Sequence, residues 1–159
     1  MSDSARDMLR HTLATLAYRA AKAVRGAPDG FGDFRAGPTS RTPSQILSHI
    51  CDLMDWALTQ ARGQQAWTDT EPASWRADTS RLFKAMRTLD DYLASPEPLG
   101  YPEGQIFQGA IADALTHVGQ INYLRRLFGN PVRGENYFRA DIATGRVEAE
   151  QAAPRREFD

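Results

Sequence analysis

Four segments of the sequence repeat apolar residues at the three- to four-residue spacing of an α-helix, and this pattern limits the fold more than any other feature. The first segment covers residues 5–24 and is followed by Gly26 and Pro28, which are residues that stop helices. Two others cover about residues 73–94 and 105–128. No stretch shows a convincing strand pattern. Four amphipathic segments without strands predict an all-α fold, a four-helix bundle.

The second of the four segments carries a clear signal for the start of a helix. Thr42 is the expected N-cap, Pro43 suits the first helical position, and Gln45 completes a capping-box pattern. We expect this helix to end near Gly63. Its inward stripe consists of five apolar residues: Ile46, Ile50, Leu53, Trp56 and Ala57.

The same helix carries a second apolar strip on its opposite side. The strip consists of Leu47, Cys51, Met54 and Leu58. A helix that is apolar on two faces in a small bundle favours contact between one face and another subunit. Coverage by loop residues is the alternative. We therefore expect a homodimer.

Long connections separate the predicted helices. The stretch at 26–41, "GAPDGFGDFRAGPTSR", is long for a compact domain and indicates a covering or functional role, with Phe31 and Phe34 tucked against the bundle. The connections leave room for crossovers, so simple up-and-down connectivity is not assumed. We expect residues 1–159 to form one domain with a polar extension from about residue 131, which either folds back on the bundle or covers the site.

Composition excludes several classes of function. The 159 residues carry a formal net charge of −1, which gives no global attraction to nucleic acid or to an anionic membrane. No apolar run approaches the roughly 18 residues that span a bilayer, and the N-terminus lacks the apolar segment of a signal peptide. Cys51 is the only cysteine, so an internal disulfide or a Cys-rich zinc site is impossible. We expect a cytoplasmic protein with neither a nucleic-acid nor a membrane partner.

Polar residues interrupt the apolar stripes of two predicted helices. On a helical wheel of 105–128, Asp113 and His117 fall within the apolar face and Gln120 lies near its edge. His49 lies at the centre of the inward stripe of the second helix. Burying a carboxylate without partners is costly, so something must compensate it. A bound metal and a proton-sharing network are both candidates.

The spacing of these residues fits a metal site. Asp113 and His117 are four residues apart, so their side chains share one helix face and can converge on a single ion. His49 is the obvious third ligand. Two imidazoles and one carboxylate leave coordination positions open for water or substrate. A satisfied polar core, in which Asp113 hydrogen-bonds to His117 or His49, is the alternative, and spacing alone leaves both interpretations open.

Two stretches together resemble the DinB-like (YfiT-like) superfamily of metalloenzymes. They are "RTPSQILSHICDLMDW" and "DALTHVGQINYLRRLFGNPVRGENYF". The second contains most of the family segment H-x-x-G-Q-[IL]-x-x-L-R, with one residue fewer between the histidine and the glycine. The matching residues are His117, Gly119, Gln120, Ile121, Leu124 and Arg125.

The resemblance implies a four-helix bundle, often dimeric, whose three histidines hold a divalent metal. His49 matches the ligand from the second helix and His117 the later ligand from the fourth. Asp113 stands where the family usually has the other histidine, and a carboxylate favours harder ions than imidazole does. Zinc, nickel, iron and manganese all fit such a set. Gln120 either orients a metal ligand or hydrogen-bonds to another helix.

Two functions follow as hypotheses. The first is a metal-dependent enzyme that acts on a small-molecule substrate, by hydrolysis or by transfer involving a low-molecular-weight thiol, as the resemblance implies. The second is a non-catalytic dimeric binding or stress-related bundle with a structural polar cluster. An open cavity that reaches the three ligands favours the first, and a sealed cluster favours the second.

Other residues receive simpler interpretations. We interpret Cys51 as a packed or interfacial thiol rather than a nucleophile, and Asp90 and Asp91 as a solvated acidic pair. Gly119 indicates close helix packing. Arg125 either caps charge near a helix C-terminus or holds an anionic substrate.

Overall fold

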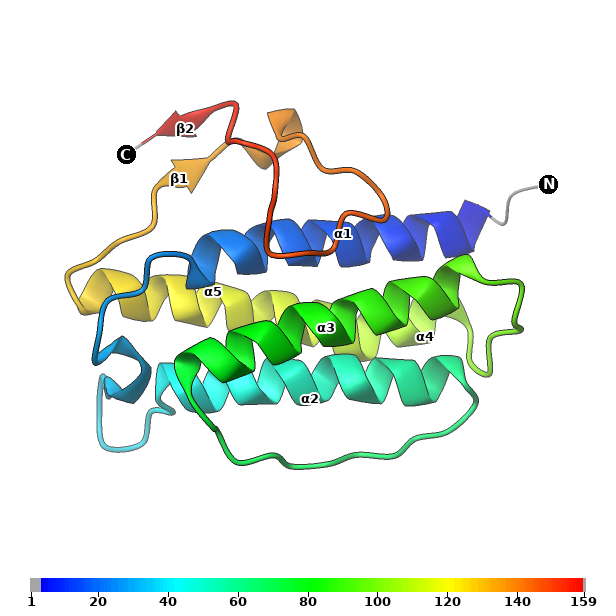
Figure 1. Ribbon diagram of the computed structural model, residues 1–159, viewed down its shortest axis with the longest axis horizontal. Helices are drawn as coiled ribbons and strands as arrows, with labels where there is room; N and C mark the ends of the chain where they lie inside the picture. The colour runs from blue at the N-terminus through cyan, green and yellow to red at the C-terminus, as the bar shows by residue number, and fades with distance from the viewer. Residues whose placement is uncertain (1–3, 159) are drawn as a thin grey trace.

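The predicted helices form an all-α bundle in the structure of the protein, a computed structural model that describes residues 4–158 (Figure 1). Each predicted segment corresponds to helical structure, and the first three agree within two residues at either end. The elements of the bundle and its first loop are α1 (Ser4–Val24), η1 (Phe31–Asp33), α2 (Pro43–Ala61), α3 (Trp75–Ala94), α4 (Glu103–Ile106), the π-helical segment η2 (Phe107–Ile111) and α5 (Ala112–Leu127).

The bundle contains one crossover connection. Both α1 and α2 pack against α3 and α5. The connection from α2 to α3, residues 62–74, returns along α2, so α2 and α3 run in the same direction (Figure 1). Simple up-and-down connectivity therefore does not apply, and α2 and α5 become neighbours across one side of the bundle.

The start of α2 is the predicted capping box. The Gln45 backbone N–H donates to Thr42 Oγ1 at 3.2 Å, and the Thr42 backbone N–H donates to Gln45 Oε1 at 2.9 Å. Two amides at the helix start are thereby satisfied, and Pro43, which has no N–H, needs no partner. This fixes the position at which α2 begins and hence the face on which its later side chains lie.

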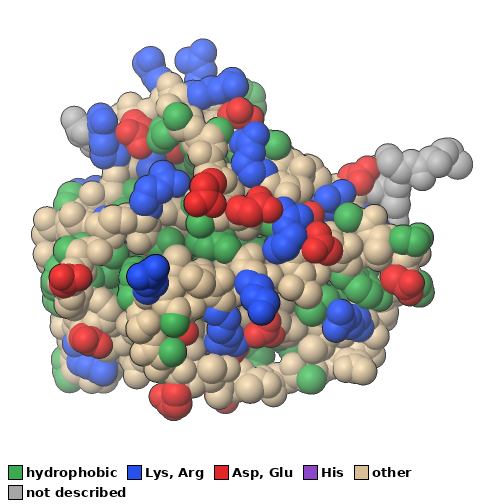
Figure 2. Space-filling view, viewed as in Figure 1, with side chains coloured by type: hydrophobic (Ala, Val, Ile, Leu, Met, Phe, Trp, Pro, Cys, Tyr) green, Lys and Arg blue, Asp and Glu red, His purple; other side chains and the backbone are tan. Residues whose placement is uncertain are grey.

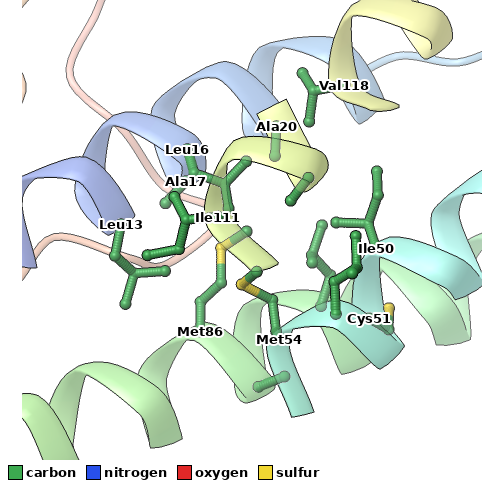
Figure 3. Packing of buried hydrophobic residues seen from close by; sticks show 14 of the residues in the cluster. Leu13, Leu16, Ala17, Ala20, Ile50, Cys51, Met54, Met86, Ile111 and Val118 are labelled. Carbon is green, nitrogen blue, oxygen red and sulfur yellow. The ribbon is translucent and has the colours of Figure 1, made fainter. Parts of the chain in front are cut away.

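The core is formed by side chains from all four sides of the bundle. Met54 of α2 and Met86 of α3 meet near its centre, close to Ile111, while Leu13 and Leu16 project from α1 (Figure 3). These five side chains are all fully buried. A core of this kind places the helices in fixed relative positions, which matters for any site that two helices share.

The second apolar strip of α2 lies inside the chain rather than at its surface. Leu47, Cys51 and Met54 are fully buried, and Leu58 is partly buried. The nearest cover is α3, because the Cys51 thiol contacts the Asp78 carbonyl oxygen at 3.4 Å. The strip therefore offers no surface to a second copy, and the expected homodimer stays a prediction without this support.

The fourth predicted helix is not one continuous α-helix. The π-helical η2 separates α4 from α5, and a π-helical turn holds one residue more than an α-helical turn. The extra residue rotates everything after it by about 100° relative to a continuous α-helix. Accordingly, the buried residues of α5 include Ala114 and Val118, each one position after a residue predicted to face the core, and Ile121, one position after Gln120, which was predicted at the edge of that face.

The C-terminal segment folds back on the bundle. Two short strands, β1 (Gly134–Glu135) and β2 (Glu157–Phe158), pair antiparallel, and η3 (Tyr137–Arg139) follows β1. These strands were not predicted, because two residues are too few to show a pattern. The segment lies over α1 (Figure 1), and side chains of both charge signs intermingle on this face (Figure 2). No helix within residues 4–158 has the length and apolar character needed to cross a bilayer.

Candidate metal centre

His49, Asp113 and His117 come together between α2 and α5. His117 Nε2 lies 3.4 Å from Asp113 Oδ1, and His49 Nε2 lies 3.7 Å from Asp113 Oδ2. The two imidazole rings stand at 89° to each other with centroids 4.7 Å apart. The structure thus groups the three residues that the sequence singled out, and this group could hold a metal ion.

The site lies at the edge of the bundle, which corrects its predicted place in the core. Asp113 was predicted to be buried, yet its side chain is 47% exposed, while His49 and His117 are 21% and 13% exposed. The rotation introduced by η2 is the physical reason. It turns Ala114 and Val118 into the core and places Asp113 and His117 at the edge of the bundle, beside α2.

Gln120 orients one of the two imidazoles. His117 Nδ1 and Gln120 Oε1 are 2.7 Å apart, one helical turn apart on α5. When Nδ1 carries the proton, it donates to this oxygen and leaves the lone pair of Nε2 facing Asp113. The predicted orienting role of Gln120 therefore fits its geometry better than a hydrogen bond to another helix.

The donor set fits a divalent ion. One ligand atom from each of the three residues lies within 4.8 Å of the other two. Ligands around a tetrahedral ion with bonds of about 2.0–2.2 Å are separated by about 3.4 Å, so the three ligand atoms, which lie within 4.8 Å of one another, must draw together to close on an ion. Two imidazoles with one carboxylate suit zinc, nickel, iron or manganese, and the set leaves coordination positions open.

The surroundings of His49 favour its neutral form, which is the form that binds a metal. Burial lowers the pKa of its imidazole, the charges of His117 and Arg41 lower it further, and Asp113 opposes these effects. A metal binds the neutral imidazole, so a lowered pKa extends the ligand form to lower pH.

A cleft opens directly onto the two histidines. Its volume is about 740 Å³, which is within the range of small-molecule binding sites. Its walls come from the end of the loop before α2, from α2 itself and from the outward face of α5: they include Ser40, Arg41, Ile46, His49, Thr116, His117, Gly119, Gln120, Tyr123 and Leu124. The two histidines are thus reachable through the cleft, and Asp113, which does not line it, has an exposed side chain beside them.

Trp67 belongs to the site but was missed in the sequence. Its ring packs edge-on against His49 at 5.5 Å between centroids and against Trp56 at 5.8 Å. The connection that carries it is fastened to α2, because Ser48 Oγ donates to the Thr70 carbonyl oxygen at 2.6 Å. The one sequence signal that could have indicated this position is that Trp67 is a single tryptophan in an otherwise polar connection.

The loop at 26–41 has the covering role that its length predicted. Phe31 is fully buried and Phe34 packs against Phe128, with ring centroids 5.3 Å apart. Its last residues, Ser40 and Arg41, reach the cleft. Arg41 is a second residue that sequence reasoning missed, since it lies just before the helix rather than on its inward stripe.

Several secondary interpretations change with the structure. Gly119 does not mark close packing: a Cβ there would meet nothing within 4 Å, whereas one at Gly109 would approach Trp56 at 3.5 Å. Arg125 is buried and donates to the carbonyl oxygens of Ala23 and Arg25 at the end of α1, so it does not face the cleft.

The acidic pair and the thiol behave differently from each other. Asp90 is 1% exposed and forms an ion pair with Arg10, with Nη2–Oδ2 at 2.9 Å. The prediction that Asp90 is solvated is therefore wrong. Asp91 is exposed, as predicted. Cys51 is a packed thiol, and burial raises its pKa to about 12, which excludes a ready nucleophile.

Comparison with models of known protein families, with curated proteins and with solved structures found no match.

Proposed function

We propose that the protein is a DinB-like, metal-dependent enzyme whose divalent ion is held by His49, Asp113 and His117. The proposal combines the family resemblance of the α2 and α5 sequences with the observed grouping of the three side chains. Its substrate is a small molecule that enters the cleft of about 740 Å³.

The chemistry follows from the open coordination positions. A divalent ion supplies Lewis-acid chemistry, which suits hydrolysis or transfer involving a low-molecular-weight thiol. The chain itself supplies the ligands, holds the His117 ring through Gln120, and shields one side of His49 with Trp67. Cys51 takes no part, because its thiol is fully buried against α3.

One observation favours this function over a structural polar cluster. A sealed cluster would bury its carboxylate and satisfy it with close hydrogen bonds. Instead the Asp113 side chain is 47% exposed, its nearest histidine nitrogens are 3.4 and 3.7 Å away, and both histidines line the cleft. Such an arrangement suits a ligand that approaches from solvent.

The test is elemental analysis of the purified protein after reconstitution with zinc, nickel, iron and manganese in turn. We expect about one ion per chain in the wild type and a loss of at least about a hundredfold in affinity for His49→Ala, Asp113→Ala and His117→Ala, because each removes one of three ligands. Asp113→His restores the usual family triad and should keep zinc while binding manganese more weakly.

His11→Ala and Asp29→Asn are the matched controls, because His11 is the third histidine of the chain and Asp29 an exposed carboxylate, and neither belongs to the group. Both should bind metal as the wild type does. Absence of stoichiometric metal from the reconstituted wild type contradicts the proposal, and retention of metal by all three ligand variants contradicts the ligand assignment.

A further inference from the structure

Arg41 adds a positive charge to the cleft beside the candidate metal ligands. Among the described residues that line the cleft, it is the only lysine or arginine. It lies on the loop directly before α2, and its charge acts on His49, whose pKa it helps to lower. The guanidinium therefore stands close to the candidate metal centre without belonging to it.

This guanidinium has no carboxylate partner within residues 4–158. Two arginines of the bundle show what such pairing looks like: Arg81 pairs with Asp52 at 2.5 Å and Arg10 with Asp90 at 2.9 Å. Asp52, Asp69 and Glu71 line a smaller pocket that Arg41 also borders, yet no ion pair joins any of them to Arg41, and Asp52 pairs with Arg81 instead. Arg41 thus retains its fork of donors for a ligand in the cleft.

The rest of the cleft is largely apolar. Ile46 of α2 and Leu124 of α5 form part of its wall, and the Tyr123 ring, 63% exposed, stands at its side. A ligand that fills this space gains from burying an apolar body against these side chains. One guanidinium balances one negative charge, which matches a carboxylate better than a doubly charged phosphate.

We infer that the cleft binds a small organic acid, with its carboxylate on Arg41 and its apolar body against Ile46, Tyr123 and Leu124. Arg41 is then a residue that determines specificity, not a catalytic one. The inference deepens the proposed function, because it names the substrate class of the same site and rests on the cleft being that site. Binding to Arg41 itself needs no metal, so the two can be tested separately.

The experiment compares 4-phenylbutyrate with its neutral amide, 4-phenylbutyramide, in NMR titrations of the metal-free full chain. We expect the acid to bind about fivefold more tightly than the amide, as an exposed charge pair allows. Arg41→Gln should abolish this difference, and Arg41→Lys should retain part of it, because the charge stays while the fork is lost. Thermal unfolding checks that both variants fold. We expect both to fold, because Arg41 is exposed on a loop.

Arg139→Gln is the matched control, since Arg139 is an exposed arginine of the C-terminal segment that does not line the cleft. It should keep the full preference for the acid. The inference is overturned if Arg41→Gln keeps the preference, or if Arg139→Gln weakens acid binding equally. If neither the wild type nor any variant binds metal, but the preference for the acid still depends on Arg41, the proposed function is contradicted and the acid site is supported.

Discussion

Two polar clusters of this bundle, the metal-ligand group and the cluster around Glu135, use carboxylates in opposite ways. The Glu135 side chain is fully buried. It accepts a hydrogen bond from Tyr18 Oη at 2.6 Å and forms an ion pair with Lys22 Nζ at 2.8 Å. Asp113 is half-exposed and faces two imidazole nitrogens at 3.4 and 3.7 Å.

The difference lies in whether the partners within the chain satisfy the carboxylate. The partners of Glu135 come from α1, so the cluster fastens the C-terminal segment to the bundle and its purpose is complete within the chain. Within residues 4–158, no partner of Asp113 reaches the 2.7–2.9 Å of a strong charge-assisted hydrogen bond. The carboxylate of Glu135 is therefore fully satisfied within the chain, whereas that of Asp113 is loosely paired.

The largest expected effect is on stability at Glu135. Glu135→Ala leaves Tyr18 and Lys22 without their buried acceptor, so we expect the free energy of unfolding to fall by about 3 kcal/mol. Asp113→Ala should change it by less than about 0.5 kcal/mol, because the carboxylate is exposed and loosely paired. Urea unfolding followed by circular dichroism measures both.

Glu150→Ala, an exposed glutamate of the same C-terminal segment, controls for the loss of one negative charge and should leave stability unchanged. An equal loss of stability in Asp113→Ala and Glu135→Ala would remove the distinction between the two clusters.

A smaller effect is expected at Gln120, which contacts His117 and is not itself one of the three proposed metal ligands. Gln120→Ala should lower metal affinity about tenfold, because the His117 ring loses the acceptor at 2.7 Å that holds its orientation. Stability should not change, since Gln120 is exposed. Competition titration against a chelator measures the affinity, with the exposed Gln105→Ala as the control. Unaltered affinity would show that Gln120 does not orient the ligand.

The smallest effect is a pH dependence of the metal-free protein. The pKa of His49 is lowered in the folded state, so below its ordinary value near 6.5 the unfolded chain takes up a proton that the folded chain does not. Stability should therefore fall as pH drops through 6.5 and stop falling below the folded pKa. His49→Gln should flatten this part of a stability–pH curve, whereas His11→Gln should not; two curves of the same shape would contradict the assignment.

Much of the fold could be predicted from sequence because its signals are local. The capping box of Thr42 and Gln45 spans only four residues, and its hydrogen bonds form as predicted. The three site residues could also be found, because four-residue spacing on one helix and an isolated histidine on another are visible without a structure. The second strip of α2 could not be assigned, since its cover, α3, arrives by a crossover that no local pattern encodes.

The exposure of the site could not be predicted, for a different reason. A helical wheel assumes a constant rotation per residue, and η2 breaks that assumption between Ile106 and Ala112. Trp67 and Arg41 were missed because their place depends on how two connections fold around α2, which is tertiary information.

The π-helical turn also bears on how such a site can arise during evolution. A π-helical turn corresponds to a single inserted residue that the helix absorbs without breaking. One insertion or deletion could therefore carry Asp113 and His117 between the interior and the cleft while every ligand stays unchanged. Homologues that share all three ligands but lack the extra residue would present them to a different environment, so helix length upstream of Asp113 is as informative as the ligands themselves.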